Sequence, residues 1–224
     1  MRIGILGGTG PAGSALGARL ASVGYDVVIG SRSRYRALEV VDGLKSKWPD
    51  LNLSLQAGDN HAASECDVVV LATPWDGAAT TAQEHIGLLK GKVVISMANA
   101  LVRVGHEFQP LLPPRGSVAA HVQAAVPACR VVAAFHHLPA KELGHLGEPI
   151  DSDVLICSDD AEATAIAMEI TSHIPGCRPL DAGELSNATA IEAFTAVLLQ
   201  LNVRYKTRVA PKLTGIKKDP RAGA

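Results

Sequence analysis

Three glycines near the N-terminus constrain the fold of this chain more than any other feature. Gly8, Gly10 and Gly13 stand between a short apolar run at residues 3–6 and a stretch over residues 14–23 that repeats apolar residues at helical spacing. On a strand-to-helix turn, the first glycine permits a tight bend, the second lets the backbone approach a pyrophosphate, and the third lets the helix pack on the strand. The pattern predicts a dinucleotide-binding turn whose helix offers free amides to the phosphates. An ordinary glycine-rich turn is the alternative.

The second predicted strand, over residues 26–30, ends in a basic segment. Ser31 and Arg32 come first, and no acidic residue follows until Glu39. NAD-binding chains usually place Asp or Glu here to hold the ribose 2′-hydroxyl. Ser31 can instead donate a hydrogen bond, and Arg32 can pair with a 2′-phosphate through its planar guanidinium. The segment predicts NADP rather than NAD, with ordinary surface arginines as the alternative.

Further apolar runs predict strands at residues 66–72, 92–96, 130–135 and 153–157. Runs that are apolar at every position indicate a parallel sheet covered by helices on both faces. We therefore expect an α/β fold, a doubly wound (Rossmann) and mostly parallel sheet, over residues 1–140.

A small C-terminal α/β lobe is expected over residues 141–210. It would hold a helix near 160–172, a short strand at 178–180 and a final helix at 185–205. Residues 211–224, rich in Lys, Arg, Gly and Pro, predict a tail with little internal structure. The proline-rich run at 110–114 is expected to be the longest interruption between strands.

Composition narrows the class of protein. The 224 residues, 47% of them hydrophobic, can bury one full core but hardly two large domains. A net charge of −1 gives no reason to expect nucleic acid or a membrane as partner. No apolar run is long enough to span a membrane, and no secretory signal is present. Scattered cysteines without metal-ligand spacing predict reduced, mostly buried thiols, no metal and a cytoplasmic location: Cys66, Cys129, Cys157 and Cys177.

Chemistry is expected where the strands end, because ligands of doubly wound sheets lie outside the carboxyl ends of the strands. Thr73, Pro74 and Trp75 follow one strand and Asn99 follows another. These residues are expected to line the nicotinamide half of the cofactor. Asn99 could equally be a simple turn residue, and Trp75 could pack in the core rather than stack on a flat ligand.

A pair of histidines, His136 and His137, stands at a third strand end. His136 could orient a second reactant beside the nicotinamide, or one histidine could lie in a loop while the other satisfies a buried carbonyl. Only about 85 residues follow this strand, fewer than the substrate domain of most small-molecule dehydrogenases. No convincing proton-transfer residue is present. The sequence therefore suggests a reaction that moves hydride alone, with the second reactant stacked on the nicotinamide.

Several longer segments are more specific than the glycine motif and occur in order along nearly the whole chain. They are Gly7-Gly-Thr-Gly10, Gly30-Ser31-Arg32, Thr73-Pro74-Trp75, Phe135-His136-x-Leu138-Pro139-Ala140, Arg178-Pro-Leu-Asp-Ala-Gly183-x-Leu185-x-Asn187 and Leu201-Asn202-x-Arg204-Tyr205-Lys206. Together they resemble the NADPH-dependent coenzyme F-420 reductases (F-420:NADP oxidoreductases). The resemblance implies hydride transfer between NADP and a deazaflavin co-substrate, without metal or bound flavin. The apolar final helix and the small second lobe favour a homodimer.

The resemblance also implies roles for individual residues. Thr9, Gly10, Pro11 and Ala12 would hold the pyrophosphate, while Ser31, Arg32 and Arg36 would hold the 2′-phosphate. The backbone amide of Ala140 would hold the carboxamide, and His136 and Leu138 would border the stacked rings. The last helix would close over the deazaflavin, with Thr195 as its polar candidate.

One position departs from the family pattern. Thr189 stands where the family carries Arg, which removes a cation that would face the anionic ring system of the deazaflavin. Arg204 or Lys206 could compensate, binding could be weaker, or another electron partner could be used. A reductase of another flat acceptor (a flavin or a metal centre) and a non-catalytic NADP-sensing protein therefore stay open as alternatives.

Overall fold

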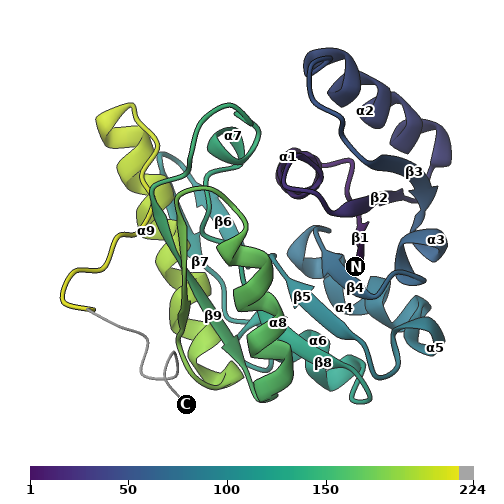
Figure 1. The fold of residues 1–224 in the computed structure, drawn as a ribbon. Helices are drawn as coiled ribbons and strands as arrows, with labels where there is room; N and C mark the ends of the chain where they lie inside the picture. Colours follow the sequence, from purple (N-terminus) through teal and green to yellow (C-terminus); the bar gives the residue numbers. More distant parts are fainter. Residues whose placement is uncertain (217–224) are drawn as a thin grey trace.

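The computed structural model describes residues 1–216, and the end of the expected tail, residues 217–224, lies outside the described residues. An eight-stranded sheet in the order β10-β9-β8-β5-β4-β1-β2-β3 forms its centre (Figure 1). The strands are β1 Arg2–Leu6, β2 Asp26–Ser31, β3 Leu55–Asp59, β4 Val68–Leu71, β5 Val93–Ser96, β8 Arg130–Ala133, β9 Ser152–Ser158 and β10 Cys177–Asp181. All neighbours pair in parallel except β8 and β9, which are antiparallel. The expected mostly parallel doubly wound sheet is confirmed.

Helices cover both faces of this sheet. They are α1 Pro11–Ser22, α2 Arg34–Lys47, α3 Asn60–Ser64, α4 Trp75–Glu84, α5 Ile86–Leu89, α6 Val118–Ala125, α7 Ala140–Leu143, α8 Ala161–Ser172 and α9 Ala188–Tyr205, the last preceded by a 3₁₀ turn at Leu185–Asn187. Side chains of α1, α2 and α8 pack on one face, and side chains of α4, α6 and α9 pack on the other. Within the described residues, no helix is long and apolar enough to cross a membrane.

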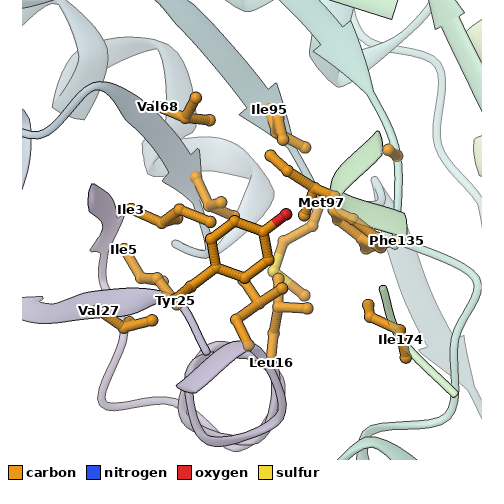
Figure 2. Packing of buried hydrophobic residues seen from close by; sticks show 14 of the residues in the cluster. Ile3, Ile5, Leu16, Tyr25, Val27, Val68, Ile95, Met97, Phe135 and Ile174 are labelled. Carbon is orange, nitrogen blue, oxygen red and sulfur yellow. The ribbon is translucent and has the colours of Figure 1, made fainter. Parts of the chain in front are cut away.

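The core explains why the strands are apolar at every position. Val68 and Val70 of β4 point into one hydrophobic cluster, whereas Val69 and Leu71 point into the other. Successive strand residues face opposite sides of a sheet, so a strand covered on both sides buries each of them. Figure 2 shows the first cluster, where Tyr25 lies among side chains of β1, β2 and α1.

The C-terminal elements agree with the expected lobe, but they extend the same sheet. The expected strand at 178–180 is β10, and the expected helices at 160–172 and 185–205 are α8 and the 3₁₀ turn with α9. A boundary between two units at residue 140 stays a prediction.

One expectation was wrong. The interruption expected at 110–114 begins inside a strand, because β6 Leu101–Val104 and β7 Glu107–Pro110 form an antiparallel hairpin with Leu101 opposite Pro110. The hairpin is mostly exposed, so its strands lack the apolar run by which the sequence predicted the central strands. Its residue Phe108 donates a backbone hydrogen bond to Gln200 of α9, which ties the hairpin to the last helix.

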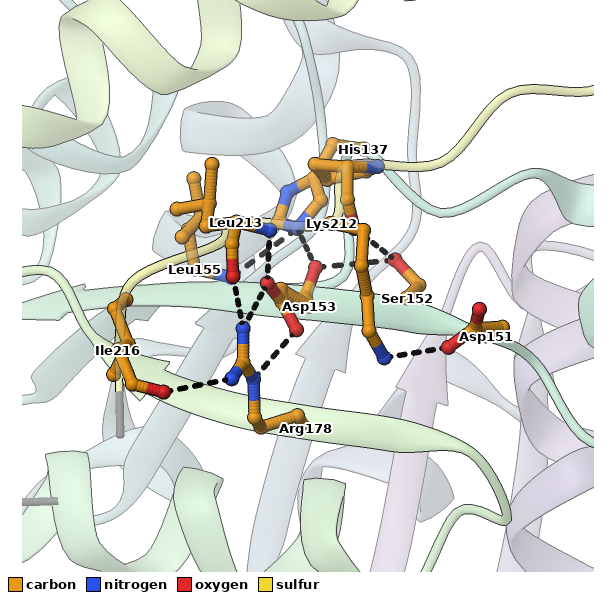
Figure 3. A network of polar contacts seen from close by, with 10 residues as sticks. His137, Asp151, Ser152, Asp153, Leu155, Arg178, Lys212, Leu213 and Ile216 are labelled. Carbon is orange, nitrogen blue, oxygen red and sulfur yellow. Dashed lines mark hydrogen bonds and ion pairs between the residues drawn. The ribbon is translucent and has the colours of Figure 1, made fainter. Parts of the chain in front are cut away.

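The first residues of the expected tail form no helix or strand, yet they are bound to the edge of the sheet (Figure 3). The fully buried carboxylate of Asp153 accepts two hydrogen bonds from Arg178, at 2.8 and 2.6 Å, and one from the backbone of Leu213. The backbone amide of Asp153 in turn donates to the carbonyl of Pro211 at 2.8 Å. The pKa of Asp153 is lowered, because these donors, with Arg178 foremost, outweigh its burial. A buried charge thus anchors residues 211–213 although they form no helix or strand.

Candidate functional site

The glycine turn is built largely as expected, with one correction. The residue with the left-handed backbone is Gly7, at φ +70°, and not Gly8. Gly8 and Gly13 are needed for close packing, because a Cβ on either would lie 2.9 Å from backbone or side-chain atoms. A Cβ on Gly10 would meet nothing closer than 3.8 Å, so its open side is where a ligand can approach the backbone.

The helix after the turn is prepared for an anion. Pro11 occupies the first position of α1, where its missing N–H costs nothing, and Ala12 and Gly13 follow in the first turn. The first amides of a helix have no intrahelical partner and carry the positive end of the helix dipole. They satisfy the requirements of a pyrophosphate site.

A cavity of about 700 Å³, here called the first cavity, opens beside this turn. It is lined by Gly7, Thr9, Gly10, Ser31, Arg32, Ser33, Arg36, Asn60, Ala72, Thr73, Pro74, Asp76, Gly77 and Thr81. The strand ends of β1, β2 and β4 therefore converge as predicted, whereas Asn60, Asp76 and Thr81 were not anticipated from the sequence.

The far end of the first cavity fits a 2′-phosphate. Ser31 is buried, and its hydroxyl accepts the amide of Ser33 at 3.2 Å, which leaves its own proton available. Ser33 caps α2 by accepting the amide of Arg36 at 3.4 Å, and this helix start directs both Arg32 and Arg36 to the cavity. Arg34 lines a different hollow.

Two further polar residues, Asn60 and Thr73, lie in the wall of the first cavity. Asn60 accepts the amide of Gly7 through Oδ1 at 3.2 Å and so holds the glycine turn. The hydroxyl of Thr73 is buried without a hydrogen-bond partner, and a buried unpaired hydroxyl in a cavity wall is suited to a ligand. Trp75, in contrast, does not line the cavity. It packs against the second core cluster, as in the second of the two roles that the sequence left open for it.

A second cavity of about 360 Å³ lies at the carboxyl ends of β5 and β8. Its walls are Asn99, His136, His137, Leu138, Pro139, Ala140, Lys141, Thr195, Leu198, Leu199, Asn202, Arg208 and Val209. The predicted residues Asn99, His136, Leu138, Ala140 and Thr195 are thus brought together. Arg208 was not predicted.

The end of β8 is strained where it meets this cavity. Phe135 is fully buried and has φ +64°, the left-handed region that a bulky side chain rarely adopts. Such a conformation costs on the order of 1–3 kcal/mol and persists where the surroundings enforce it, often at functional sites. The consequence here is that the next residue, His136, turns its ring into the cavity wall.

His136 is a neutral, unsatisfied histidine. Only 5% of its surface is exposed, and neither ring nitrogen makes a hydrogen bond of good geometry, although the backbone of Ala134 interacts with the ring. Burial, followed by the proximity of His137, lowers the pKa of His136 well below 6.5. The imidazole therefore keeps one donor and one acceptor, both unpaired, for a ligand.

His137 has a structural role instead. Its Nε2 accepts the backbone amide of Leu155 at 3.2 Å, which joins the strand end to β9. Burial lowers its pKa to about 4, so it is neutral as well. The sequence left open which of the two histidines serves structure, and the contacts assign that role to His137.

Asn99 joins the strand ends of β5 and β8. Its Nδ2 donates to the carbonyl of His136 at 2.7 Å, while its Oδ1 is buried without a partner. An unpaired amide oxygen beside the unpaired imidazole suits a ligand that donates a hydrogen bond, such as a carboxamide.

The segment carrying Ala140 is held from behind by Arg19 of α1. Its guanidinium, 1% exposed, donates five hydrogen bonds of 2.6 to 3.3 Å to backbone carbonyls of residues 142–148. No carboxylate takes part in these bonds, and burial lowers the pKa of this guanidinium, which still stays charged. All five N–H groups are used, so this one side chain fixes the whole loop that follows α7.

Helix α9 closes the other side of the second cavity. Thr195 is buried and donates weakly, at 3.5 Å, to the carbonyl of Ile191, so its hydroxyl can still serve a ligand. The nearby Glu192 accepts the amides of Val118 and Ala119 at 2.7 and 3.1 Å and fastens α9 to the start of α6. Burial raises the pKa of Glu192 to about 7.

The departure at Thr189 lies away from both cavities. Its hydroxyl would meet a Cβ on Gly116 at 2.9 Å, so it packs on the loop before α6. It precedes Thr195 by six residues, which places it on another side of α9, about 9 Å along the axis. The cations in the wall of the second cavity are Lys141 of α7 and Arg208, which follows α9.

The chain is similar to known proteins over most of its length. Residues 2–100 match the family model described as NADP oxidoreductase coenzyme F420-dependent. The "F420-dependent NADP reductase" of Methanocaldococcus jannaschii is 37% identical over 222 residues, 97% of each chain. That of Methanothermobacter marburgensis is 32% identical over 219 residues, which are 94% of this chain and 96% of the relative.

Two further matches are more distant. A crystal structure described as a putative F420-dependent NADP reductase from Arthrobacter sp. FB24 has a TM-score of 0.75 and 24% identity, and covers 93% of this chain and 99% of that one. At that identity it shows the fold. "Metalloreductase STEAP3" of Rattus norvegicus is 28% identical, but the match covers 88% of this chain and only 37% of that protein. The two matches from Methanocaldococcus jannaschii and Methanothermobacter marburgensis cover nearly the full length of both partners, and on that evidence the chain belongs to the family of F420-dependent NADP reductases.

Proposed function

We propose that this protein transfers hydride between NADP(H) and the deazaflavin coenzyme F-420. The observation that carries the proposal is the pair of cavities at one edge of the sheet, one with phosphate-binding features and one with unpaired neutral polar groups. Full-length similarity to F420-dependent NADP reductases supports the same activity.

The first cavity would hold the adenosine and phosphate half of NADP. Gly10 and the first turn of α1 face the pyrophosphate, and Ser31, Arg32 and Arg36 face the 2′-phosphate. The only acidic residue among those lining this cavity is Asp76, in the first turn of α4, where a helix start stabilises its charge. The two arginines therefore dominate the end of the cavity.

The second cavity would hold the two reacting rings. When bound, the two coenzymes supply the chemistry, because hydride passes from a carbon of the nicotinamide to a carbon of the deazaflavin. The side chains of Asn99 and His136 orient rings through unpaired polar atoms, and Leu138 excludes water beside them. The amide of Ala140 and the hydroxyl of Thr195 are proposed as further contacts from opposite walls.

The polar groups that would face the two rings are neutral. Burial, followed by the proximity of His137, holds the pKa of His136 well below 6.5, and Asn99 and Thr195 carry no charge. Lys141 and Arg208 also line this cavity. Neutral groups beside the rings match a reaction that moves hydride alone.

We further propose a homodimer in the cytoplasm. Exposed apolar side chains gather on α9 and the β6–β7 hairpin, with Phe194, Val197 and Val104 each more than 40% exposed. Such a patch is typical of a protein interface. Sedimentation at micromolar concentration tests the dimer. The four free cysteines suit a reducing compartment, and fractionation of cells tests the location.

Mixing the purified protein with NADPH and oxidised coenzyme F-420 tests the activity. We expect the deazaflavin absorbance to fall in proportion to NADPH consumed. An NADP-sensing protein would bind NADPH without this change, and a reductase of another acceptor would respond only to free flavin or a metal complex. Absence of transfer from pH 6 to 8 would refute the proposal.

A further inference from the structure

Helix α9 carries one acidic residue, Glu192, and its carboxylate is buried, with only 5% of the residue exposed. The two carboxylate oxygens accept the backbone amides of Val118 and Ala119 at 2.7 and 3.1 Å. Among residues 1–216, no Lys, Arg or His forms an ion pair with this carboxylate. Glu192 is therefore bound to backbone amides and not to a cation.

These amides belong to the start of α6. Val118 and Ala119 are the first two residues of that helix, and such amides have no partner within a helix. The fully buried Ser117 accepts the next amide, that of Ala120, at 3.0 Å. Negative charge is stabilised at a helix start. Glu192 thus completes the N-terminal cap of α6 from another helix, more than 70 residues away along the chain.

A second hydrogen bond ties α9 to the same part of the chain. Gln200 accepts the backbone amide of Phe108 in the β6–β7 hairpin at 3.3 Å. The hairpin and α6 both belong to the segment that runs from Asn99 to His136, two residues in the wall of the second cavity. Helix α9 is therefore fixed at two points to the segment that joins these two walls.

Glu192 can affect the second cavity through the position of α9. Thr195 and Leu199 follow it by three and seven residues, so all three lie on neighbouring turns of one side of the helix. Thr195 and Leu199 line the second cavity, whereas Glu192 lines neither the first nor the second cavity. A shift of α9 at Glu192 would accordingly move Thr195 relative to the opposite wall at Leu138.

Burial raises the pKa of Glu192 to about 7, although the two amides oppose this shift. The nearby titratable groups are the thiol of Cys157 in β9 and the carboxylate of Asp181 in β10. Burial, followed by the charges of Asp181 and Glu192, raises the pKa of Cys157 to about 11, so this thiol is neutral. On the side of α6, neither Arg115 nor His121 forms an ion pair with Glu192 within the described chain. The carboxylate and the carboxylic acid are both populated near neutral pH.

We propose that Glu192 is a positioning residue for the second hydride carrier: its carboxylate holds α9 against the start of α6, and this sets where Thr195 meets the ring of that carrier. The inference rests on the proposed function, which places the second carrier in the second cavity. A protonated carboxyl group carries a hydrogen on one oxygen, which then accepts an amide poorly. The charge of a residue that touches neither coenzyme therefore affects the affinity for one of them.

Glu192→Gln tests the inference, because glutamine has nearly the shape of a protonated glutamate. Glu169→Gln, an exposed change on α8, is the matched control. The Kd of oxidised coenzyme F-420 and of NADPH is titrated at about pH 6 and about pH 8.5, on either side of the pKa of Glu192. Hydrogen exchange at the higher pH follows the amides of Val118 and Ala119, and urea unfolding shows that each variant is folded.

At the higher pH, Glu192→Gln should raise the Kd of coenzyme F-420 about fivefold and speed exchange of the two amides, as for a residue that acts through a neighbouring element. At the lower pH, wild type and variant should agree within about twofold, because both side chains are then neutral. The Kd of NADPH should change less than about twofold throughout, since α9 does not line the first cavity that would hold its phosphates. The control should bind both coenzymes as the wild type does.

Val118→Pro removes the same contact from the side of α6. Proline is well tolerated at the first position of a helix, and the preceding Ser117 already has the extended backbone that proline favours. This variant lacks the amide that lies 2.7 Å from Glu192 and should show the same selective loss of coenzyme F-420 affinity at the higher pH.

Three results would overturn the inference. Unchanged binding of coenzyme F-420 at the higher pH, in either variant, would show that the contact does not position α9. A ratio of Kd values between wild type and Glu192→Gln that is the same at both pH values would show that the charge plays no part, because ligand and all other residues titrate alike in both proteins. An equal loss of NADPH affinity would indicate general loosening instead of positioning of one carrier.

The inference and the proposed function fail separately. A wild-type protein that binds coenzyme F-420 but passes it no hydride contradicts the function. Hydride transfer with an affinity for coenzyme F-420 that is insensitive to Glu192 contradicts only the positioning role.

Discussion

Replacing Arg19 by Met should loosen the wall of the second cavity, because one guanidinium holds the loop behind Ala140. The five carbonyls it satisfies belong to residues 142–148, while Leu143 of the same segment is fully buried in the core. A buried carbonyl left without a donor costs about 1–3 kcal/mol. Five such losses together would rival the whole stability of a typical domain.

Water limits this cost. The loop is partly exposed, so its carbonyls can be hydrated once the segment shifts outward. We therefore expect Arg19→Met to lower the free energy of unfolding by about 3–5 kcal/mol, as when one partner is removed from a buried charged network. Arg19→Lys, with three donors in place of five, should lose less.

Two assays separate the global and local parts of this effect. Urea unfolding gives the stability, and hydrogen exchange of the amides across residues 140–148 reports opening of the loop. In folded Arg19→Met, KM for NADPH should rise more than kcat falls, since the amide of Ala140 is no longer fixed. Lys45→Met, an exposed change on α2, is the control. If Arg19→Met unfolds within about 0.5 kcal/mol of the wild type and its loop amides exchange normally, the reasoning fails.

Three further predictions follow from the cofactor turn and the buried histidines. Arg32→Asp should weaken NADPH binding by about 1.5–3 kcal/mol and spare NADH, as measured by titration; equal losses for both would show that Arg32 does not contact the 2′-phosphate. Gly13→Ala should destabilise the fold by about 1–3 kcal/mol, because its Cβ meets atoms 2.9 Å away, whereas Gly10→Ala should unfold like the wild type yet bind NADPH poorly; the opposite ranking in thermal unfolding and titration would contradict these roles. The pKa of His137, lowered to about 4, means that the unfolded chain binds this proton first as pH falls below 6.5. Acidification from pH 7 to 4.5 should therefore cost the wild type about 2 kcal/mol more than His137→Gln, measured by urea unfolding at each pH, and parallel pH profiles would count against a buried neutral ring.

The sequence revealed the parts of the fold that depend on local pattern. Apolar runs indicated the central strands because a parallel sheet buries every residue, and the glycine spacing indicated the turn before α1. The β6–β7 hairpin was not predicted because its short strands are exposed. The sequence assigned the tight bend of the turn to Gly8, whereas the residue in the left-handed region is Gly7. Choosing between adjacent glycines requires the backbone angles.

The residues of the site also fall into two groups, those that the sequence predicts and those that it does not. Residues at strand ends were found because topology alone brings them together, as with Asn99 and His136. Arg19 looked like an ordinary position on an amphipathic helix, since its carbonyl partners lie more than 120 residues away. Arg208 reaches the cavity because the chain reverses its direction after α9, and no sequence pattern predicts that turn.

Direct transfer of hydride between two coenzymes is the central claim, and isotope tracing tests it most directly. The protein is given NADPH carrying deuterium at both positions of the reduced nicotinamide carbon, with oxidised coenzyme F-420 in ordinary water, and the reduced deazaflavin is examined by mass spectrometry. Because hydride passes directly between two carbons and the buried ring of His136 in the second cavity is neutral, we predict one deuterium in every reduced deazaflavin molecule. Reduced deazaflavin that carries hydrogen from water instead would contradict the account.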